Sequence, residues 1–453
     1  MSVLGNIWKI KELRSRILFT MGLVFICRMV AFVPTPGVDA SALRDMIAGM
    51  QRTAGGGFMG MFDLFSGGAL SQVAVGTLSI WPYISASIII QLMTAIIPAL
   101  ERMAREGETG RQKLNQTTRY LTLALCLVQS FAIARGLESA GSMGGGHGQI
   151  VEIPGWPFRI LTMLTMTSAT MLLMWLGEQI TARGIGNGTS VIIMINICSR
   201  LPAALIQGGS LFISTGGVAA RFNIFYLIFL LLLAFFVFAG TIALTQGLRR
   251  IPIHTARRTV GARVTGGQST YMPLRVNYTG VMPIIFAGPI LGALGWLLRQ
   301  VNVNWLKWLK AIGISLSHQT DWLFLTIYSL SILFFSFFWV ATQFNAVQIA
   351  DDLKRSGGYV PGIRPGLPTA EFLDLTMTRV TLIGAVGLVI IAVLPGILQT
   401  RLEVPRLLAG FLGGTSLLII VGVALDTMRQ IESYLVMRNY DGFLKHGRLR
   451  GRR

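Results

Sequence analysis

Long apolar stretches recur along the whole chain and constrain its fold more than any other feature. Each is 17 to 25 residues long, enough for a helix to cross roughly 30 Å of hydrocarbon. Charged residues make up 13% of the chain, about half the share of roughly 25% found in soluble domains. We therefore predict an all-α polytopic membrane protein. Its ten expected spans are 17–33, 73–97, 118–136, 157–179, 187–207, 222–245, 279–298, 320–344, 374–395 and 410–430.

The positive charges gather on one side of these expected spans. With an even number of spans both termini share that side, which carries 27 of the 39 Lys and Arg residues. Because basic loops remain in the cytoplasm, we expect both termini to be cytoplasmic. For most of these cations a role as topology signals is a sufficient explanation. The first span does not have the pattern of a secretory leader, since it contains Arg28 and no small-residue cleavage site follows it.

The residue patterns of common enzymes are missing from this sequence. Cys27, Cys126 and Cys198 lie inside expected spans, with a spacing that fits neither a disulfide framework nor a zinc site. The chain has no His-Glu-x-x-His, no Gly-x-Ser-x-Gly and no phosphate-binding Gly-x-x-x-x-Gly-Lys-Ser/Thr. We therefore predict a protein that is not an enzyme and uses neither a cofactor nor a metal.

Three loops are too long to be simple connections. The first contains "GGGFMGMFDLFSGGALSQ" at 55–72, which is apolar but too rich in glycine to span; a re-entrant element and a surface loop both fit it. In the second, 246–278, two partly alternating runs flank Gly266-Gly267 and predict a β-hairpin. The third, 345–379, contains "GGYVPGIRPG", a stiff turn that carries Arg364. Together they suggest a membrane core with a cytoplasmic docking platform.

The middles of the expected spans are apolar. An ion-coupled transporter usually places a carboxylate or histidine deep in a span. This sequence offers little of that kind, since Glu178, Arg183, Asp426, Arg429 and Glu432 lie at cytoplasmic span ends. Arg28 lies nearer the external end of the first span, where snorkelling or bridging between helices explains it better than a proton relay. An apolar path excludes ions and water by dewetting, which suits a pore that opens only for a large guest.

Eight stretches, in order along the chain, resemble the bacterial SecY family, the channel subunit of the general protein translocase. They are "FSGGALSQ", "PYISASIIIQL", "EGETGRQKLNQTTRY", "WLGEQITARGIGNGTSVII", "RRIPI", "MPLRVNYTGVMPIIFA", "GGYVPGIRPG" and "FLGGTSLLIIVGVALDTMRQIESYLVMRNYDGFL". The resemblance implies ten helices in two inverted five-helix halves around a central pore. The implied divisions are a cytoplasmic segment 1–16, an N-terminal half 17–207, a C-terminal half 208–430 and a basic cytoplasmic tail 431–453.

The family's pore has a constriction of apolar side chains, and its motifs carry this ring over to six positions. They are Ile84, Ile88, Thr189, Ile193, Ile285 and Ile419. Two pairs are four residues apart and so fall on one helix face. Thr189 departs from the family, which usually has an aliphatic residue there; we expect its hydroxyl to bond back to helix carbonyls and leave the ring dry.

The resemblance also implies a plug, a short re-entrant helix at 58–72 that closes the external funnel at rest. Its expected residues are Phe62, Phe65, Ser66, Gly67 and Gly68, and the two glycines give the backbone freedom to fold inward and leave. Spans 2 and 3 would face spans 7 and 8 across a lateral gate, through which a signal sequence or transmembrane segment reaches the lipid.

Two cytoplasmic loops resemble the family's docking loops for the motor ATPase SecA and the ribosome. Their expected contacts are Arg249, Arg250, Arg257, Arg258 and Arg364. A guanidinium pairs bidentately with the carboxylates of a motor surface or the phosphates of rRNA. The family commonly has Asn-Pro after span 8, whereas this chain has Asn345-Ala346. The sequence therefore does not predict the conformation at the start of this loop.

We therefore expect a channel that passes unfolded secretory polypeptides across the bacterial plasma membrane and releases transmembrane segments sideways. By resemblance its partners are SecE-like and SecG-like subunits, SecA, the ribosome, signal sequences, nascent chains and membrane lipids. Two alternatives remain at this stage. An ion-coupled secondary transporter would show broken helices around a midplane site, and a structural scaffold would lack the plug-like loop.

Overall fold

The computed structural model describes residues 10–39, 66–143, 151, 154–209, 224–255, 258–260, 263–265, 269–299, 307–317 and 321–446. The chain divides into two compact units, and each is described by itself. The first unit joins Met1–Pro202 to Ile419–Arg453, and the second is Ala203–Leu418. The last helix, α18 (Gly414–His446), therefore begins in the second unit and continues in the first.

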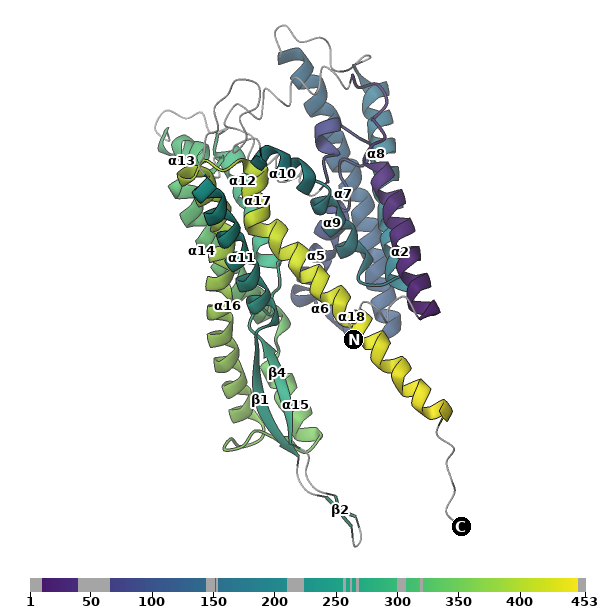
Figure 1. Ribbon diagram of the computed structural model, residues 1–453, viewed down its shortest axis with the longest axis vertical. Coiled ribbons are helices and arrows are strands. Elements are labelled where there is room, and N and C mark those ends of the chain that lie inside the picture. The colour runs from purple at the N-terminus through teal and green to yellow at the C-terminus, as the bar shows by residue number, and fades with distance from the viewer. Residues whose placement is uncertain are drawn as a thin grey trace. The chain divides into compact units, whose positions relative to one another are not determined.

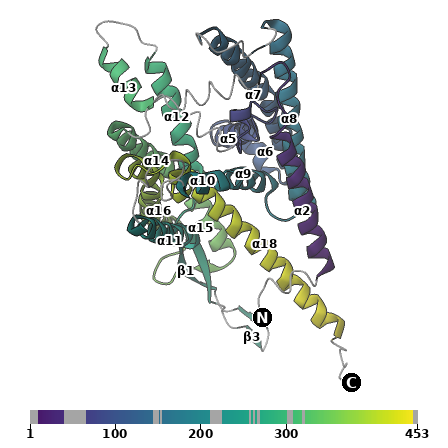
Figure 2. The ribbon, with the colours of Figure 1, turned by 45° about the horizontal axis from the view of Figure 1, so that its top comes forward.

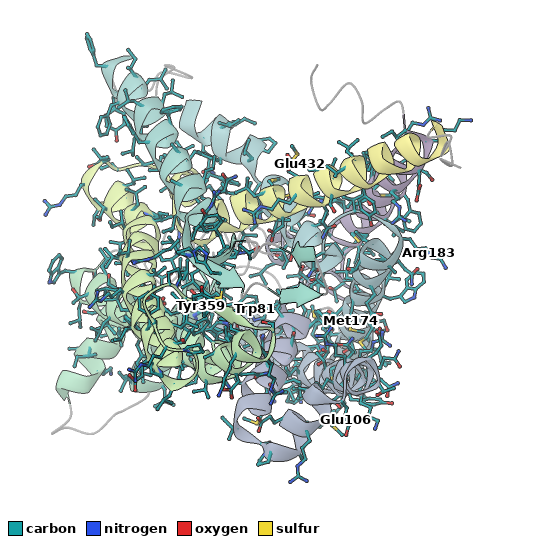
Figure 3. The ribbon with its side chains drawn as sticks, turned by 90° about the horizontal axis from the view of Figure 1, so that it is seen from below. Trp81, Glu106, Met174, Arg183, Tyr359 and Glu432 are labelled. Carbon is teal, nitrogen blue, oxygen red and sulfur yellow. The ribbon has the colours of Figure 1, made fainter. Side chains whose placement is uncertain are left out.

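The first unit is a helical bundle. Its helices before α18 are α2 (Lys11–Val30), α5 (Trp81–Ile96), α6 (Pro98–Arg105), α7 (Glu108–Met143), α8 (Trp156–Arg183), α9 (Gly188–Cys198) and the start of α10 (Leu201–Gly209). Helices α7 and α8 run side by side (Figures 1 and 2), and α8 also contacts α2 and α9. Trp81 and Glu106, labelled in Figure 3, mark the start of α5 and the end of α6.

Two ion pairs join α7 to α8, one near each end. Arg119 donates to both carboxylate oxygens of Glu178, at 2.9 and 2.7 Å. At the other end Arg159 Nη2 lies 2.7 Å from Glu138 Oε2, and both side chains are largely buried. Glu138 also accepts a hydrogen bond from the Gly155 N–H at the start of α8. These contacts fix the register of α7 against α8, because each pair joins side chains far apart in the sequence.

The expected span 73–97 begins as a helix later than predicted. Helix α5 starts only at Trp81, and residues before it form turns and the single 3₁₀ turn η1 (Leu70–Gln72). Val73 and Ser79 have φ of 38° and 49°, a left-handed conformation that no helix contains. Apolar composition there reflects burial inside the protein, which periodicity alone cannot distinguish from a helix.

The second unit packs helices beside a small sheet. Its helices after α10 are α11 (Ile224–Gln246), α12 (Met282–Arg299), α13 (Lys307–Ser317), α14 (Trp322–Gln343), α15 (Ala346–Arg355), α16 (Leu367–Arg401) and α17 (Arg406–Leu412). Helices α14 and α16 lie side by side, and α12 packs on α13 and α14. The core of this bundle includes Ile284, Ile332 and Leu388, all 0–1% exposed. Helix α13 was not expected from the sequence.

The expected β-hairpin is confirmed. Strand β1 (Leu248–Thr255) pairs antiparallel with β4 (Ser269–Arg275). Beyond them β2 (Arg258–Val260) pairs with β3 (Arg263–Thr265), and Val260 faces Arg263. Gly266-Gly267 lies outside the described residues. The period-2 pattern predicted the two long strands because alternate side chains of a strand lie on one face of the sheet.

We expected the segment 345–379 to be a loop because of its composition, and this prediction was wrong. It contains α15, the strand β5 (Gly358–Tyr359) and the start of α16. Strand β5 adds to the other side of β1, so the sheet order is β4-β1-β5. Figure 1 labels β1 and β4 of this sheet, and Figure 3 labels Tyr359 of β5. A shared core of Ile251, Leu274, Ala350 and Leu373 holds sheet and helices together.

Each of the ten expected spans contains a helix. Seven helices of the described residues are long and apolar enough to cross a membrane, or eight if the bent pair Trp81–Thr94 and Pro98–Ala104 is one span. The apolar part of α12, Met282–Gly295, is shorter, and α2 occupies the first expected span but starts with charged residues. The expected span 187–207 is one of the seven, Gly188–Gly209; a turn at Ser199-Arg200 separates α9 from α10 within it.

Candidate pore and docking site

Two of the predicted ring residues meet the predicted plug in the first unit. Ile84 of α5 and Ile193 of α9 line one small cavity together with Ser66. Leu78, Ile80 and Trp81 complete most of its wall, and its surface is mainly apolar. Ile84 lies one turn after the start of α5, and Ile193 lies mid-way along α9.

Three of the other four ring positions lie on α5, α12 and α18. Ile88, four residues after Ile84 on α5, is 3% exposed. Ile285 on α12 is 8% exposed, and Ile419 on α18 is 5% exposed. All three side chains are thus buried within the protein. A ring of all six residues would draw on both units, and it stays a prediction.

Thr189 does not bond as we expected. Its hydroxyl donates to Asn187 Oδ1 at 2.7 Å, and not to a helix carbonyl. The reason is its position: α9 begins at Gly188, so no helical carbonyl lies four residues before Thr189. Its methyl group lies against α8, because a Cβ built on Gly177 would be 3.3 Å from Thr189 Cγ2. The hydroxyl is therefore satisfied locally.

The described part of the predicted plug is buried irregular backbone. Phe62 and Phe65 lie outside the described residues, while Ser66 is 2% exposed and Ala69 is fully buried. Thr77 Oγ1 donates to the carbonyl of Ala69 at 3.2 Å, and Thr35 Oγ1 donates to that of Val73 at 2.7 Å. Polar backbone is tolerated at membrane depth only when protein or water satisfies it. The burial of Ser66 and Ala69 favours a re-entrant element over a surface loop, and the plug at 58–72 stays a prediction.

The start of α9 is held by side chains from three helices. Ile185 N–H donates to Thr20 Oγ1 of α2 at 3.1 Å, and Gly186 N–H donates to Gln430 Oε1 of α18 at 2.8 Å. Gly188 N–H donates to Thr181 Oγ1 of α8, also at 2.8 Å. These bonds fix the first turn of α9 and hence the direction in which Ile193 points.

Replacing Thr20 by valine should therefore loosen this turn. The change keeps the shape of the side chain and leaves the partly buried Ile185 N–H without its acceptor, which costs about 1–3 kcal/mol of unfolding free energy. Thermal unfolding of the purified protein measures the loss. Thr165→Val on α8 is the matched control, since the hydroxyl of this half-buried residue bonds only to carbonyls of its own helix. Equal unfolding temperatures for the two variants would contradict the assignment.

The predicted docking arginines of the hairpin lie on β1. Arg249 and Arg250 are both exposed, and they pair with Leu274 and Pro273 of β4. As neighbours on a strand they point to opposite faces of the sheet. Arg257 lies outside the described residues, and Arg258 belongs to β2. The hairpin thus presents cations along a strand that Ile251 anchors in the core.

Arg364 stands on a short, well-anchored turn. The turn follows β5 and is closed by the Ile363 N–H bond to the carbonyl of Val360 at 3.1 Å. Val360 is buried in the core shared by sheet and helices, and Thr369 Oγ1 donates to the Arg364 carbonyl at 2.8 Å. Gly362 and Gly366 have φ of 83° and 105°, which glycine adopts without strain. The Arg364 side chain is exposed.

Ala346, at the position where we noted that the family commonly has proline, does not disturb the start of α15. Asn345 caps the helix, its Oδ1 accepting from the Gln348 N–H at 3.1 Å. Ala346 is the first helical residue and is 9% exposed. Proline is favoured at this position because its φ is already helical, and here the asparagine cap alone defines the start.

Asn196 and Ser79, which lie close to the predicted plug, were not singled out from the sequence. Asn196 on α9 is 4% exposed and joins Arg28 to Ser79: it accepts from Arg28 Nη1 at 3.3 Å and donates to Ser79 Oγ at 3.0 Å. Arg28 is thus a helix-bridging cation, one of the two roles expected for it. The signal for Asn196 was present, since an amide inside an apolar span is a functional candidate by default.

Comparison with known proteins supports one family. The family model described as SecY matches residues 74–428. Over the full length of both chains, the sequence is 41% identical to protein translocase subunit SecY of Chlamydia trachomatis. It is 41% identical to protein translocase subunit SecY of Escherichia coli K12, covering 97% of this chain and 96% of the relative.

Solved structures agree at the level of the fold. A protein-conducting channel matches with a TM-score of 0.56 at 16% identity, covering 92% of this chain and 91% of the other. Sec61 in the canine ribosome-channel complex matches with a TM-score of 0.53 at 14% identity and the same coverage. The order of the motifs, the helical fold and full-length identity lead to the same conclusion. This chain belongs to the SecY family.

Proposed function

We propose that this protein is the pore subunit of a translocase, which passes unfolded secretory polypeptides across the membrane and releases transmembrane segments into the bilayer. The observation that carries the proposal is the cavity in which Ser66 of the buried turn meets Ile84 and Ile193. Movable backbone against apolar side chains is the arrangement that a plugged, dry constriction requires. The six ring residues and the plug then act together to seal the resting channel.

The proposed partners follow from the relatives and from the charged loops. Solved relatives include channels in ribosome complexes, canine Sec61 and yeast Ssh1, which supports the ribosome as a partner here. SecA would use the same cations, with Arg364 as the central contact. SecE-like and SecG-like subunits are proposed as companions in the membrane. We place the protein in the bacterial plasma membrane with both termini in the cytoplasm, as the basic loops indicate.

Reconstitution tests this function directly. Liposomes containing the protein and its small subunits are given SecA, ATP and a radiolabelled secretory precursor, and protease-protected precursor is measured. Protection should require the protein and ATP and should disappear in detergent. An ion-coupled transporter would instead accumulate a small solute when an ion gradient is applied. Precursor that stays protease-sensitive in complete vesicles would contradict the proposal.

The proposed ring gives a second, sharper test. Ile285→Asn places an amide in a dry constriction, where a polar group without a partner costs about 1–3 kcal/mol. We therefore expect the closed state to weaken, so that precursors with defective signals are translocated about tenfold faster and resting vesicles leak ions. Ile290→Asn is the matched control, since Ile290 is on the same helix but 45% exposed. Unchanged signal stringency and ion leak in Ile285→Asn would show that the ring is misassigned.

A further inference from the structure

The turn Ser66–Ala69 is fitted to two arginines. Gly67 and Gly68 both have positive φ, 67° and 95°. A Cβ built on Gly67 would lie 2.4 Å from Arg28 Nη1, and one built on Gly68 would lie 2.6 Å from Arg200 Cζ. No side chain fits at either glycine without displacing a guanidinium. The turn therefore sits directly against two cations.

These arginines come from separate elements. Arg28 is in the last turn of α2. Arg200 is in the turn between α9 and α10. The neighbouring Ser199 Oγ donates a hydrogen bond to the Gly67 carbonyl oxygen at 3.4 Å.

Arg28 is held in place by a buried amide. Asn196 accepts from its Nη1 and is itself fixed by its bond to Ser79. Arg28 also lies over the Phe32 ring, 5.4 Å from the centroid. A cation at membrane depth is costly and is retained where it has a role. Snorkelling to the external water would not need this oriented amide.

We propose that Arg28, Asn196 and Arg200 form a socket that seats the Gly67–Gly68 turn, and that these positioning residues set how readily the channel opens. The inference rests on the proposed function of this segment as a plug. When the plug leaves, the glycine backbone departs from both guanidinium groups, while Asn196 keeps Arg28 in position for its return. The apolar ring seals against ions; the socket determines how long the plug stays seated.

Labelling of a buried reporter tests the socket without any transport. Ser66→Cys is nearly isosteric at a position that is 2% exposed. Right-side-out membrane vesicles with this reporter are treated with a membrane-impermeant maleimide, without SecA or precursor. The parent chain with its native cysteines gives the background. Adding Arg28→Gln or Asn196→Ala should speed labelling about tenfold or more, because a hydrogen bond to a charged group is lost.

Further variants separate the socket from general damage. Arg28→Lys should restore much of the protection, since an ammonium can still donate to Asn196. Arg135→Gln is the matched control, an exposed arginine at the far end of α7. Should Arg28→Gln fail to accumulate, Arg200→Gln and Asn196→Ala carry the test. Labelling at the parent rate in these socket variants, or an equal rise with Arg135→Gln, would overturn the proposal.

A second measurement keeps the two proposals apart. Vesicles of each variant are supplied with SecA, ATP and a precursor with an intact signal. Socket variants should translocate it at least as fast as the parent, and should accept defective signals more readily. If no vesicle, parent included, protects the precursor, the proposed function fails. If all protect it with parental stringency and parental labelling, only the socket fails.

Discussion

Replacing Arg364 by glutamate is expected to abolish SecA-driven translocation while the protein folds and inserts normally. The side chain is exposed on a turn whose backbone is fixed by Val360 and by the Thr369 hydroxyl. Because the turn is rigid, little conformational entropy is lost when a partner binds. The attraction between the Arg364 cation and the partner therefore adds to the binding free energy with little offset. Charge reversal then places two anions face to face, which costs several kcal/mol.

The measurement is precursor protection in reconstituted vesicles, with SecA binding followed in parallel. We expect translocation to fall by at least about a hundredfold, with the unfolding temperature unchanged. Arg14→Glu is the matched control, because Arg14 is exposed on α2. This substitution reverses an equal charge in another segment of the chain. Normal SecA-driven transport by Arg364→Glu, or an equal loss with Arg14→Glu, would refute a docking role for Arg364.

Replacing Gly188 by alanine should remove most of the folded protein from the membrane. A Cβ at this position would lie 1.9 Å from the carbonyl oxygen of Gly177 and 2.9 Å from Ile180 Cβ. The obstructing atom is backbone of α8, so it cannot rotate away as a side chain would. Helices in membranes associate through such close approaches of small residues. Separating α8 from α9 should cost about 3 kcal/mol or more of unfolding free energy.

Yield in the membrane and the unfolding temperature of the purified protein check this expectation. Gly136→Ala is the control: Gly136 lies within α7, and a Cβ there meets nothing within 4 Å. Alanine at that site should be neutral or stabilise by up to about 1 kcal/mol, since it forms helices better than glycine. Similar unfolding temperatures for the two variants would show that the close approach of α8 and α9 is not needed.

Much of the architecture could be predicted from local patterns. Apolar length located a helix in every expected span, and strand periodicity located β1 and β4. These predictions succeed because a segment in hydrocarbon must satisfy its own backbone, so its length and composition largely decide its structure. Local patterns failed where the backbone leaves regular structure. The turns that precede the start of α5 at Trp81 are of this kind.

The amino-acid sequence by itself determined the membrane class, the helices of the ten spans, the hairpin strands and the family. Only the tertiary structure decided which residues act together. It joined Asn196 to Arg28 and Ser79, brought Ser66 to Ile84 and Ile193, and divided α18 between the two units. The physical reason is the distance along the sequence between the residues that interact. Helices form from contacts between residues close in sequence, whereas these meetings depend on packing between segments as many as 168 residues apart.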